Sequence, residues 1–128
     1  MAGYVRKAFS KMPEENRRFL TDTKKTTSQR TLWMGKKRNI KPLTSMPDIR
    51  TLAKREGKKK NIIIKIGQMP SGSKYADAVH VYDKETKKQN IILHPVLQYY
   101  DKRYVRDVIH HELDHASVRN RIISHEAI

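Results

Sequence analysis

A stretch near the end of this 128-residue chain, Tyr104 to Arg119, constrains the fold more than any other because it carries a clear helical pattern. Four apolar residues recur at helical spacing and, at 100° per residue, fall within about 80° of one another: Val105, Ile109, Leu113 and Ala116. Asp101 precedes the stretch and is a typical N-cap residue. The pattern predicts an amphipathic helix with one buried face.

Within this predicted helix lies the pentapeptide His111-Glu112-Leu113-Asp114-His115. Residues four apart share one face of a helix, so His111 and His115 can direct two imidazoles at one point beside the apolar stripe. A shuffled chain of this composition would contain an H-E-x-x-H pattern in about one case in 80. The interpretation therefore depends on the context of the pentapeptide and not on its occurrence alone.

The residue types of the pentapeptide are those of a hydrolytic zinc site. Neutral imidazole binds Zn²⁺, and a catalytic zinc keeps an open position for water, whose pKa the ion lowers toward about 7. Glu112 lies one step around the helix from the two histidines, where its carboxylate is placed to act as a general base. These features predict a Zn²⁺ cofactor and hydrolysis of peptide or related amide bonds.

A catalytic zinc needs a third protein ligand, and few residues follow His115. His125 is the preferred candidate and Glu126 the alternative, ahead of Asn120 and Ser124, and a ligand from elsewhere in the chain stays open. On a straight helix position 125 would lie about 15 Å along the axis from His115, beyond coordinating reach. We therefore expect the chain to turn at Asn120, which tolerates a left-handed backbone.

The amino-acid composition narrows the cellular compartments and the structural classes that we expect for this chain. With 37% hydrophobic residues and no long apolar run, the chain suits one modest core and predicts no membrane-spanning helix. No secretory signal pattern is present, and the absence of cysteine fits a reducing compartment and excludes thiolate ligands. We expect an intracellular protein (cytoplasm, nucleoid or nucleus) or a virion component, and the sequence leaves the oligomeric state open.

The net charge of +15 is unevenly distributed. Residues 1–60 hold 18 Lys or Arg against 5 Asp or Glu, whereas residues 61–128 hold 10 against 8. Basic runs interrupted by an aromatic residue are typical of segments that neutralise phosphates, so we expect residues 1–60 to bind nucleic acid, with an acidic protein surface or a merely solvated face as alternatives. The predicted nucleic-acid-binding residues are Lys24, Lys25, Arg30, Trp33, Lys36, Lys37, Arg38, Lys58, Lys59 and Lys60.

Residues 1–60 are predicted to form a basic N-terminal arm with short helices. One helix begins at Pro13 and runs toward Leu20, and a second is capped by Ser45 and ended by Gly57. Between them Thr21 to Leu43, rich in Lys, Thr and Ser, is predicted to be an extended arm or linker.

Residues 61–128 are predicted to form the metal-binding domain, as a second region of the chain and not as an independent unit. Three segments with β-branched or alternating patterns are expected strands: Asn61 to Ile66, Ala76 to Tyr82 and Gln89 to Leu93. The last two are joined by a turn at residues 83–87 and form a hairpin. The expected fold class is α+β, a small twisted three-stranded sheet packed on the pentapeptide helix.

The segment from Asn90-Ile91-Ile92-Leu93-His94-Pro95 through the helix of the pentapeptide resembles the core of zincin metallopeptidases. It is most similar to the SprT-like group, which includes the Spartan proteases. The resemblance covers residues 61–128 and implies that His111 and His115 bind zinc, that Glu112 is the general base and that a third His follows. His125-Glu126-Ala127-Ile128 supplies that His but lacks the Gly and the aromatic residue of the family segment.

The resemblance also implies a mode of substrate binding and a class of substrate. The strand nearest the metal helix would bind an extended peptide at its edge, and Gln89 to Leu93 is the first candidate, with Ala76 to Tyr82 second. The Spartan analogy implies peptide or protein substrates associated with nucleic acid. Each candidate oxyanion donor is more often a packing residue: Tyr82, Tyr99, Tyr100 and Tyr104. His80 and His94 are expected to be structural.

Two other functional classes remain open. The pair His110-His111, with Asp114, Asn120 and His125, loosely resembles an HNH-type nuclease. A non-enzymatic basic protein, such as a virion, nucleoid or ribonucleoprotein component, would use the pentapeptide as a structural metal site or not at all.

Overall fold

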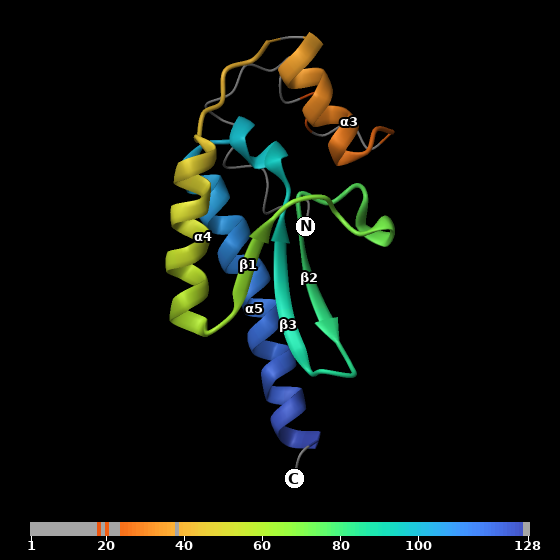
Figure 1. Cartoon of the computed structure of the whole chain (residues 1–128), viewed down its shortest axis with the longest axis vertical. Coiled ribbons are helices and arrows are strands. Elements are labelled where there is room, and N and C mark those ends of the chain that lie inside the picture. The colour runs from red at the N-terminus through yellow and green to blue at the C-terminus, as the bar shows by residue number, and fades with distance from the viewer. Residues whose placement is uncertain (1–17, 19, 21–23, 38, 127–128) are drawn as a thin grey trace.

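The computed structural model describes residues 18, 20, 24–37 and 39–126, with side chains described as far as residue 118. Within these ranges the chain is α+β, as predicted (Figure 1). Its helices are α3 (Thr27–Leu32), α4 (Met46–Lys60) and α5 (Lys102–Glu126), and its strands are β1 (Ile63–Ile66), β2 (Ala78–Asp83) and β3 (Lys88–Leu93). Short helical segments are η2 (Trp33–Lys37), η3 (Ser71–Ser73) and η4 (Pro95–Tyr99).

The three strands form a mixed sheet in the order β1-β3-β2. Strands β2 and β3 are the predicted hairpin, paired antiparallel from Ala78↔Leu93 to Asp83↔Lys88. Strand β1 pairs parallel with the other side of β3, from Ile63↔Asn90 to Ile66↔Leu93. Because β3 is therefore central, the prediction that Gln89 to Leu93 offers a free edge is wrong. The second candidate, β2, is an edge strand.

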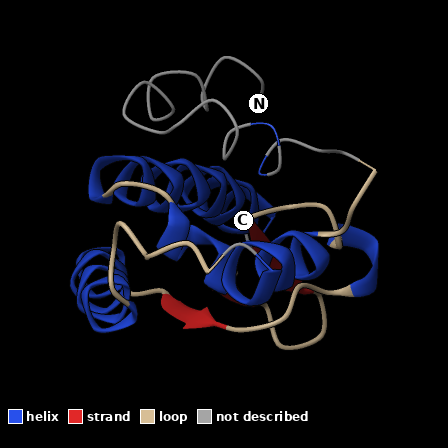
Figure 2. Cartoon of the chain, turned by 90° about the horizontal axis from the view of Figure 1, so that it is seen from above, coloured by secondary structure: helices blue, strands red, loops and turns tan. Residues whose placement is uncertain are grey.

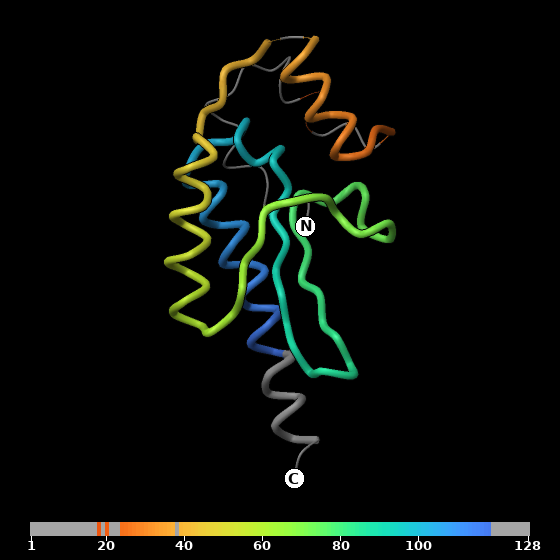
Figure 3. The backbone as a smooth tube through the Cα atoms, in the orientation of Figure 1, coloured from red at the N-terminus to blue at the C-terminus, as the bar shows by residue number. Residues whose placement is uncertain are grey.

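Helices α4 and α5 cover one face of the sheet. Helix α4 packs against β1 and α5, and α5 packs against β2 and β3 (Figures 1 and 3). The covered face carries Ile91 and Leu93, both fully buried, whereas Ile63 on the opposite face is 63% exposed. Figure 2 shows the same elements from above, with helices, strands and loops in separate colours. Every described helix is too short or too polar to cross a lipid bilayer.

Helix α4 begins at the predicted cap, where the Ser45 side chain accepts a hydrogen bond from the Asp48 amide at 3.2 Å. The predicted end at Gly57 is wrong, because the helix continues to Lys60 and ends at Asn61, which has a left-handed φ of 55°. A glycine inside a helix costs only about 1 kcal/mol, which tertiary packing outweighs. Ile49 and other α4 residues lie in the same hydrophobic core as α5, so residues on both sides of position 60 share one core.

Part of the predicted extended arm is helical. Thr26 and Gln29 form a capping box that begins α3, and the π-helical segment η2 follows it directly. Met34 in η2 is fully buried in the core. Burial of the Met34 side chain stabilises the helical conformation of this segment, although most of its residues are polar. The predicted helix from Pro13 lies outside the described residues, apart from Arg18 and Leu20.

Helix α5 confirms the predicted helix and its cap, since the Tyr104 amide donates to Asp101 Oδ1 at 2.8 Å. The predicted turn at Asn120 is wrong, because α5 continues without interruption to Glu126. Asn120 tolerates a left-handed backbone but does not require one.

Candidate metal centre on helix α5

The two histidines of the pentapeptide meet at their ring nitrogens. His111 Nε2 and His115 Nε2 lie 3.1 Å apart, and the two rings are nearly perpendicular at 86°. Two imidazole nitrogens that bind one tetrahedral ion at about 2.0–2.1 Å lie about 3.3 Å apart. The pair therefore already has nearly the separation that a shared zinc ion requires. His115 is exposed and His111 is half-buried, so an ion can reach both from solvent.

Burial tunes the ionisable groups of the pentapeptide. It lowers the pKa of His111, and the nearby His115 lowers that pKa further, which favours the neutral imidazole that binds metal. Glu112 is 5% exposed, and its burial raises the pKa of the carboxyl group. A carboxyl with a raised pKa holds a proton more readily, which is the property that a general base near neutral pH needs.

The third ligand predicted from sequence does not fit the helix. His125 and Glu126 lie on the same unbroken helix as His111 and His115. Ten residues of α-helix span about 15 Å, so neither position reaches an ion held by the pair within one chain. Among the residues whose side chains are described, no group of three His, Asp or Glu could hold a metal ion. The pair could thus supply two ligands, and a catalytic zinc would need at least one more from the protein.

The other side of α5 is held by a buried carboxylate of α4. His110 Nε2 donates to Glu56 Oε1 at 2.6 Å, and Lys59 Nζ lies 2.8 Å from Glu56 Oε2. Glu56 is 3% exposed, and the hydrogen bonds from Lys59 and His110 lower the pKa of its carboxyl group to about 2. This contact ties α4 to α5 next to His111. The sequence offered no signal for it beyond the presence of His110.

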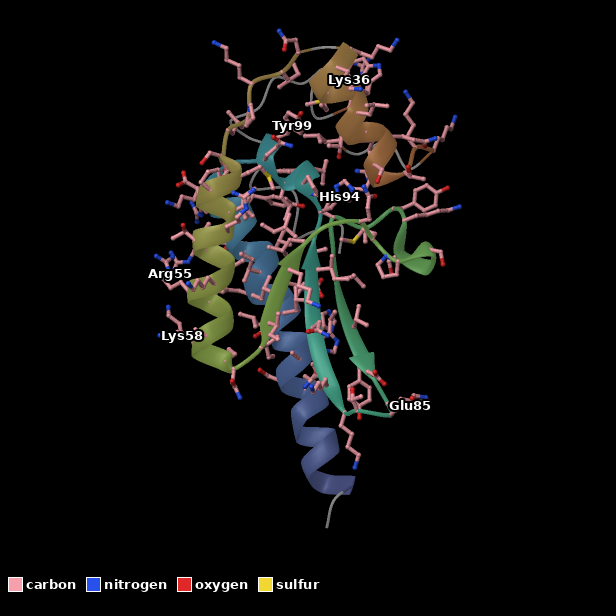
Figure 4. The ribbon with its side chains drawn as sticks, in the orientation of Figure 1. Lys36, Arg55, Lys58, Glu85, His94 and Tyr99 are labelled. Atoms are coloured by element: carbon pink, nitrogen blue, oxygen red, sulfur yellow. The ribbon has the colours of Figure 1, made fainter. Side chains whose placement is uncertain are left out.

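Three of the four candidate oxyanion tyrosines are packing residues. Tyr99, Tyr100 and Tyr104 are at most 5% exposed. The rings of Tyr100 and Tyr104 stack with centroids 4.2 Å apart, and the Tyr104 hydroxyl donates to Asp77 Oδ2 at 3.3 Å. Tyr99 lies in η4, at the end of the sheet near α3 (Figure 4). Tyr82, on the edge strand β2, is half-buried and remains a candidate.

His94 joins the end of β3 to α3 (Figure 4). Its Nδ1 accepts a hydrogen bond from the Val96 amide at 3.0 Å, so Nε2 carries the proton and lies 3.0 Å from Ser28 Oγ. Burial lowers the pKa of His94 to about 4. His80 Nε2 lies 2.6 Å from Gln89 Oε1 across the hairpin. These contacts agree with the structural roles expected for both histidines.

The predicted nucleic-acid-binding residues do not share one environment. Arg30 is 5% exposed and donates hydrogen bonds to the Leu20 carbonyl, to Thr27 Oγ1 and to the Tyr75 carbonyl. Its predicted role is therefore wrong, because the guanidinium is used to hold the fold together. Trp33 packs against the core, with Lys25 Nζ 6.0 Å from its ring centroid. Arg38 lies outside the described residues.

The exposed cations of this predicted set fall into two groups. Lys24, Lys36 and Lys37 lie on and around α3 and η2, whereas Lys58 to Lys60 form the last turn of α4. Figure 4 shows Lys36 near α3 and Lys58 toward the far end of α4. Lys59 is also engaged with Glu56. A nucleic acid bound at α3 would therefore meet the first group.

Comparisons of the chain with protein-family models, with curated proteins and with solved structures found no match.

Proposed function

We propose that this chain is a zinc-dependent metallopeptidase of the zincin type. The observation that carries the proposal is the approach of His111 Nε2 and His115 Nε2 to 3.1 Å on one helix, next to the buried carboxyl of Glu112. Strand β1, the β2–β3 hairpin and helix α5 follow one another in the order expected from the sequence patterns, with the hairpin directly before the pentapeptide helix. The similarity to SprT-like proteases rests on the sequence resemblance alone.

Each residue of the pentapeptide has a separate role in this proposal. His111 and His115 would hold the ion through their Nε2 atoms, and His110 and Glu56 would keep α5 in place on α4. A bound zinc supplies a Lewis acid that makes water a nucleophile near neutral pH. Glu112 would take the proton from that water and deliver it to the leaving amine. The third ligand would come from a residue beyond the described side chains, from the substrate or from a second copy.

Strand β2 is the proposed binding edge for an extended peptide substrate. It is an outer strand of the sheet and packs against α5. A peptide that pairs with a free strand edge gains main-chain hydrogen bonds that do not depend on its sequence. The basic surface around α3 would direct the enzyme to proteins associated with nucleic acid.

A non-enzymatic role is the second candidate, because only two metal ligands lie together among the described side chains. In that case the pair would form a structural metal site in a basic nucleic-acid-binding protein. The nuclease alternative is less favoured, because His110 is bound to Glu56 while His111 faces His115. Adjacent histidines of one helix point in directions about 100° apart.

Zinc binding and hydrolysis test the proposal together. The full chain should bind one zinc per chain and gain thermal stability from it, and His111→Ala with His115→Ala should abolish both effects. Glu112→Gln should keep zinc binding and lower hydrolysis of an unfolded protein substrate at least 100-fold. Hydrolysis that is unchanged in Glu112→Gln would contradict the peptidase. Zinc binding with no hydrolysis in any variant would favour the structural site.

A further inference from the structure

The second outer strand of the sheet, β1, borders a groove that lies on the opposite edge from β2. The groove has a volume of about 510 Å³ and is formed between α4 and β1. Its floor is aliphatic, and its rim is basic. The lining residues are Arg50, Ala53, Lys54 and Lys58 of α4 together with Ile62, Ile63, Ile64 and Ile66.

Gly57 explains why the groove opens where it does. A Cβ atom at this position would lie 2.5 Å from the Ile62 carbonyl oxygen, so α4 touches the following chain at this point. Asn61 then reverses the chain with its left-handed backbone, and β1 runs back beside the helix. The two elements separate from this contact, which leaves the isoleucine side chains of β1 accessible beside the helix.

The rim cations form a regular row without acidic partners. Arg50, Lys54 and Lys58 are spaced four residues apart on α4, so neighbouring positions lie about 6 Å apart along the helix. All three are exposed, and none has an ion-pair partner among the described residues, whereas Arg55 and Lys59 of the same helix pair with Glu56. No acidic residue is among the described residues that line the groove. The row is thus an uncompensated positive rim beside an apolar floor.

We propose that this groove binds an extended acidic peptide that pairs with the free edge of β1. Alternate side chains of an extended strand lie about 6.8 Å apart, which nearly matches the spacing of the rim cations. Acidic residues at every second position would meet Arg50, Lys54 and Lys58, and aliphatic residues between them would contact the exposed Ile63 on the other face of β1. Among the described residues β1 pairs only with β3, so its outer main-chain groups can accept an added strand.

Other occupants fit the groove less well. None of its lining residues is aromatic, so nucleic-acid bases would have no surface on which to stack. A flat bilayer would not reach the floor of a concave groove. A second copy of the chain also carries a net charge of +15 and would be repelled by the basic rim. The proposal does not depend on the metal centre.

The test uses fluorescence anisotropy with the full chain and a labelled peptide of about ten residues that alternates Glu with Val. The triple variant Arg50→Glu, Lys54→Glu, Lys58→Glu should weaken binding at least 10-fold. The matched control Lys84→Glu, Lys87→Glu, Lys102→Glu changes the net charge equally but lies outside the groove, and it should change affinity less than 3-fold. Thermal unfolding checks that both variants fold.

Two further probes separate pairing with β1 from charge attraction alone. A peptide of the same composition with its Glu residues in one block, and the alternating peptide N-methylated at every second amide, should each bind at least 5-fold more weakly. Equal binding of these peptides, or equal loss in both triple variants, would overturn the proposal. Tighter binding of a single-stranded oligonucleotide or an anionic vesicle than of the peptide would also overturn the proposal, if the groove variant abolishes that binding.

Discussion

Single buried polar residues decide much of this structure. Arg30, Glu56, Asp77 and His94 all lie in or near the core, and each is held by groups from a distant part of the chain. Burial of a polar group costs free energy unless its hydrogen bonds are satisfied, so these residues specify which elements meet. Arg30 illustrates the consequence, because its charge suggested a surface role and its burial excludes one.

His94 should make the protein lose stability in mild acid. Its pKa is about 4 in the folded chain and about 6.5 when exposed, so folding disfavours the charged ring. The stability that neutral His94 contributes is complete above pH 6.5 and is lost as the pH falls toward 4, by up to about 3 kcal/mol. Urea unfolding at several pH values measures this. His94→Asn keeps an acceptor for the Val96 amide, so it should flatten the pH dependence over this range, whereas His80→Asn should leave it intact.

At the scale of elements, the contact between α4 and α5 depends on Glu56. Lys59 and His110 lower its pKa to about 2 from an ordinary value of 4.5, so the carboxylate stabilises the fold above pH 4.5 and loses this effect as the pH falls to 2. Glu56→Gln should lower the free energy of unfolding by about 1–2 kcal/mol at pH 7, a loss that disappears near pH 2. Glu85→Gln, at the exposed hairpin turn (Figure 4), is the control and should have no effect.

The approach of α4 to the start of β1 depends on Gly57. Gly57→Ala should lower the free energy of unfolding by about 1–3 kcal/mol, because the added methyl group meets a backbone oxygen that cannot easily move. Gly72→Ala is the control, since nothing lies within 4 Å of a Cβ atom built there. Chemical denaturation of the two variants measures the difference. Equal stabilities would mean that the helix shifts freely away from Ile62.

At the scale of the whole molecule, the positive charge should produce binding to nucleic acid that weakens with salt. Lys36 and Lys37 are exposed at the end near α3, so Lys36→Glu with Lys37→Glu should weaken binding about 10-fold at low salt and reduce the slope against salt concentration. Lys84→Glu with Lys87→Glu makes the same change at the hairpin. Filter binding from 50 to 200 mM salt compares them. An equal loss in both variants would assign the binding to net charge alone.

The amino-acid sequence by itself determined the local elements. The spacing of apolar residues and the cap residue Asp101 were sufficient to predict the helix around the pentapeptide. The alternating strand patterns likewise predicted the β2–β3 hairpin. Both elements depend on residues close together in the chain. The same local pattern placed His111 and His115 on one helical face, where their ring nitrogens meet. The fold class followed from the order of these elements.

Only the tertiary structure decided strand order, helix ends and the environment of the charges. Strand β1 pairs with β3 across more than twenty residues of intervening chain, which makes β2 rather than β3 the edge beside α5. Packing carries α4 through Gly57 and brings Arg30 into the interior. These outcomes depend on buried contacts between distant residues, whose free energy exceeds the local preferences that a sequence displays. Likewise, α5 continues past Asn120 without the turn expected from the sequence, so position 125 lies about 15 Å along the helix axis from His115.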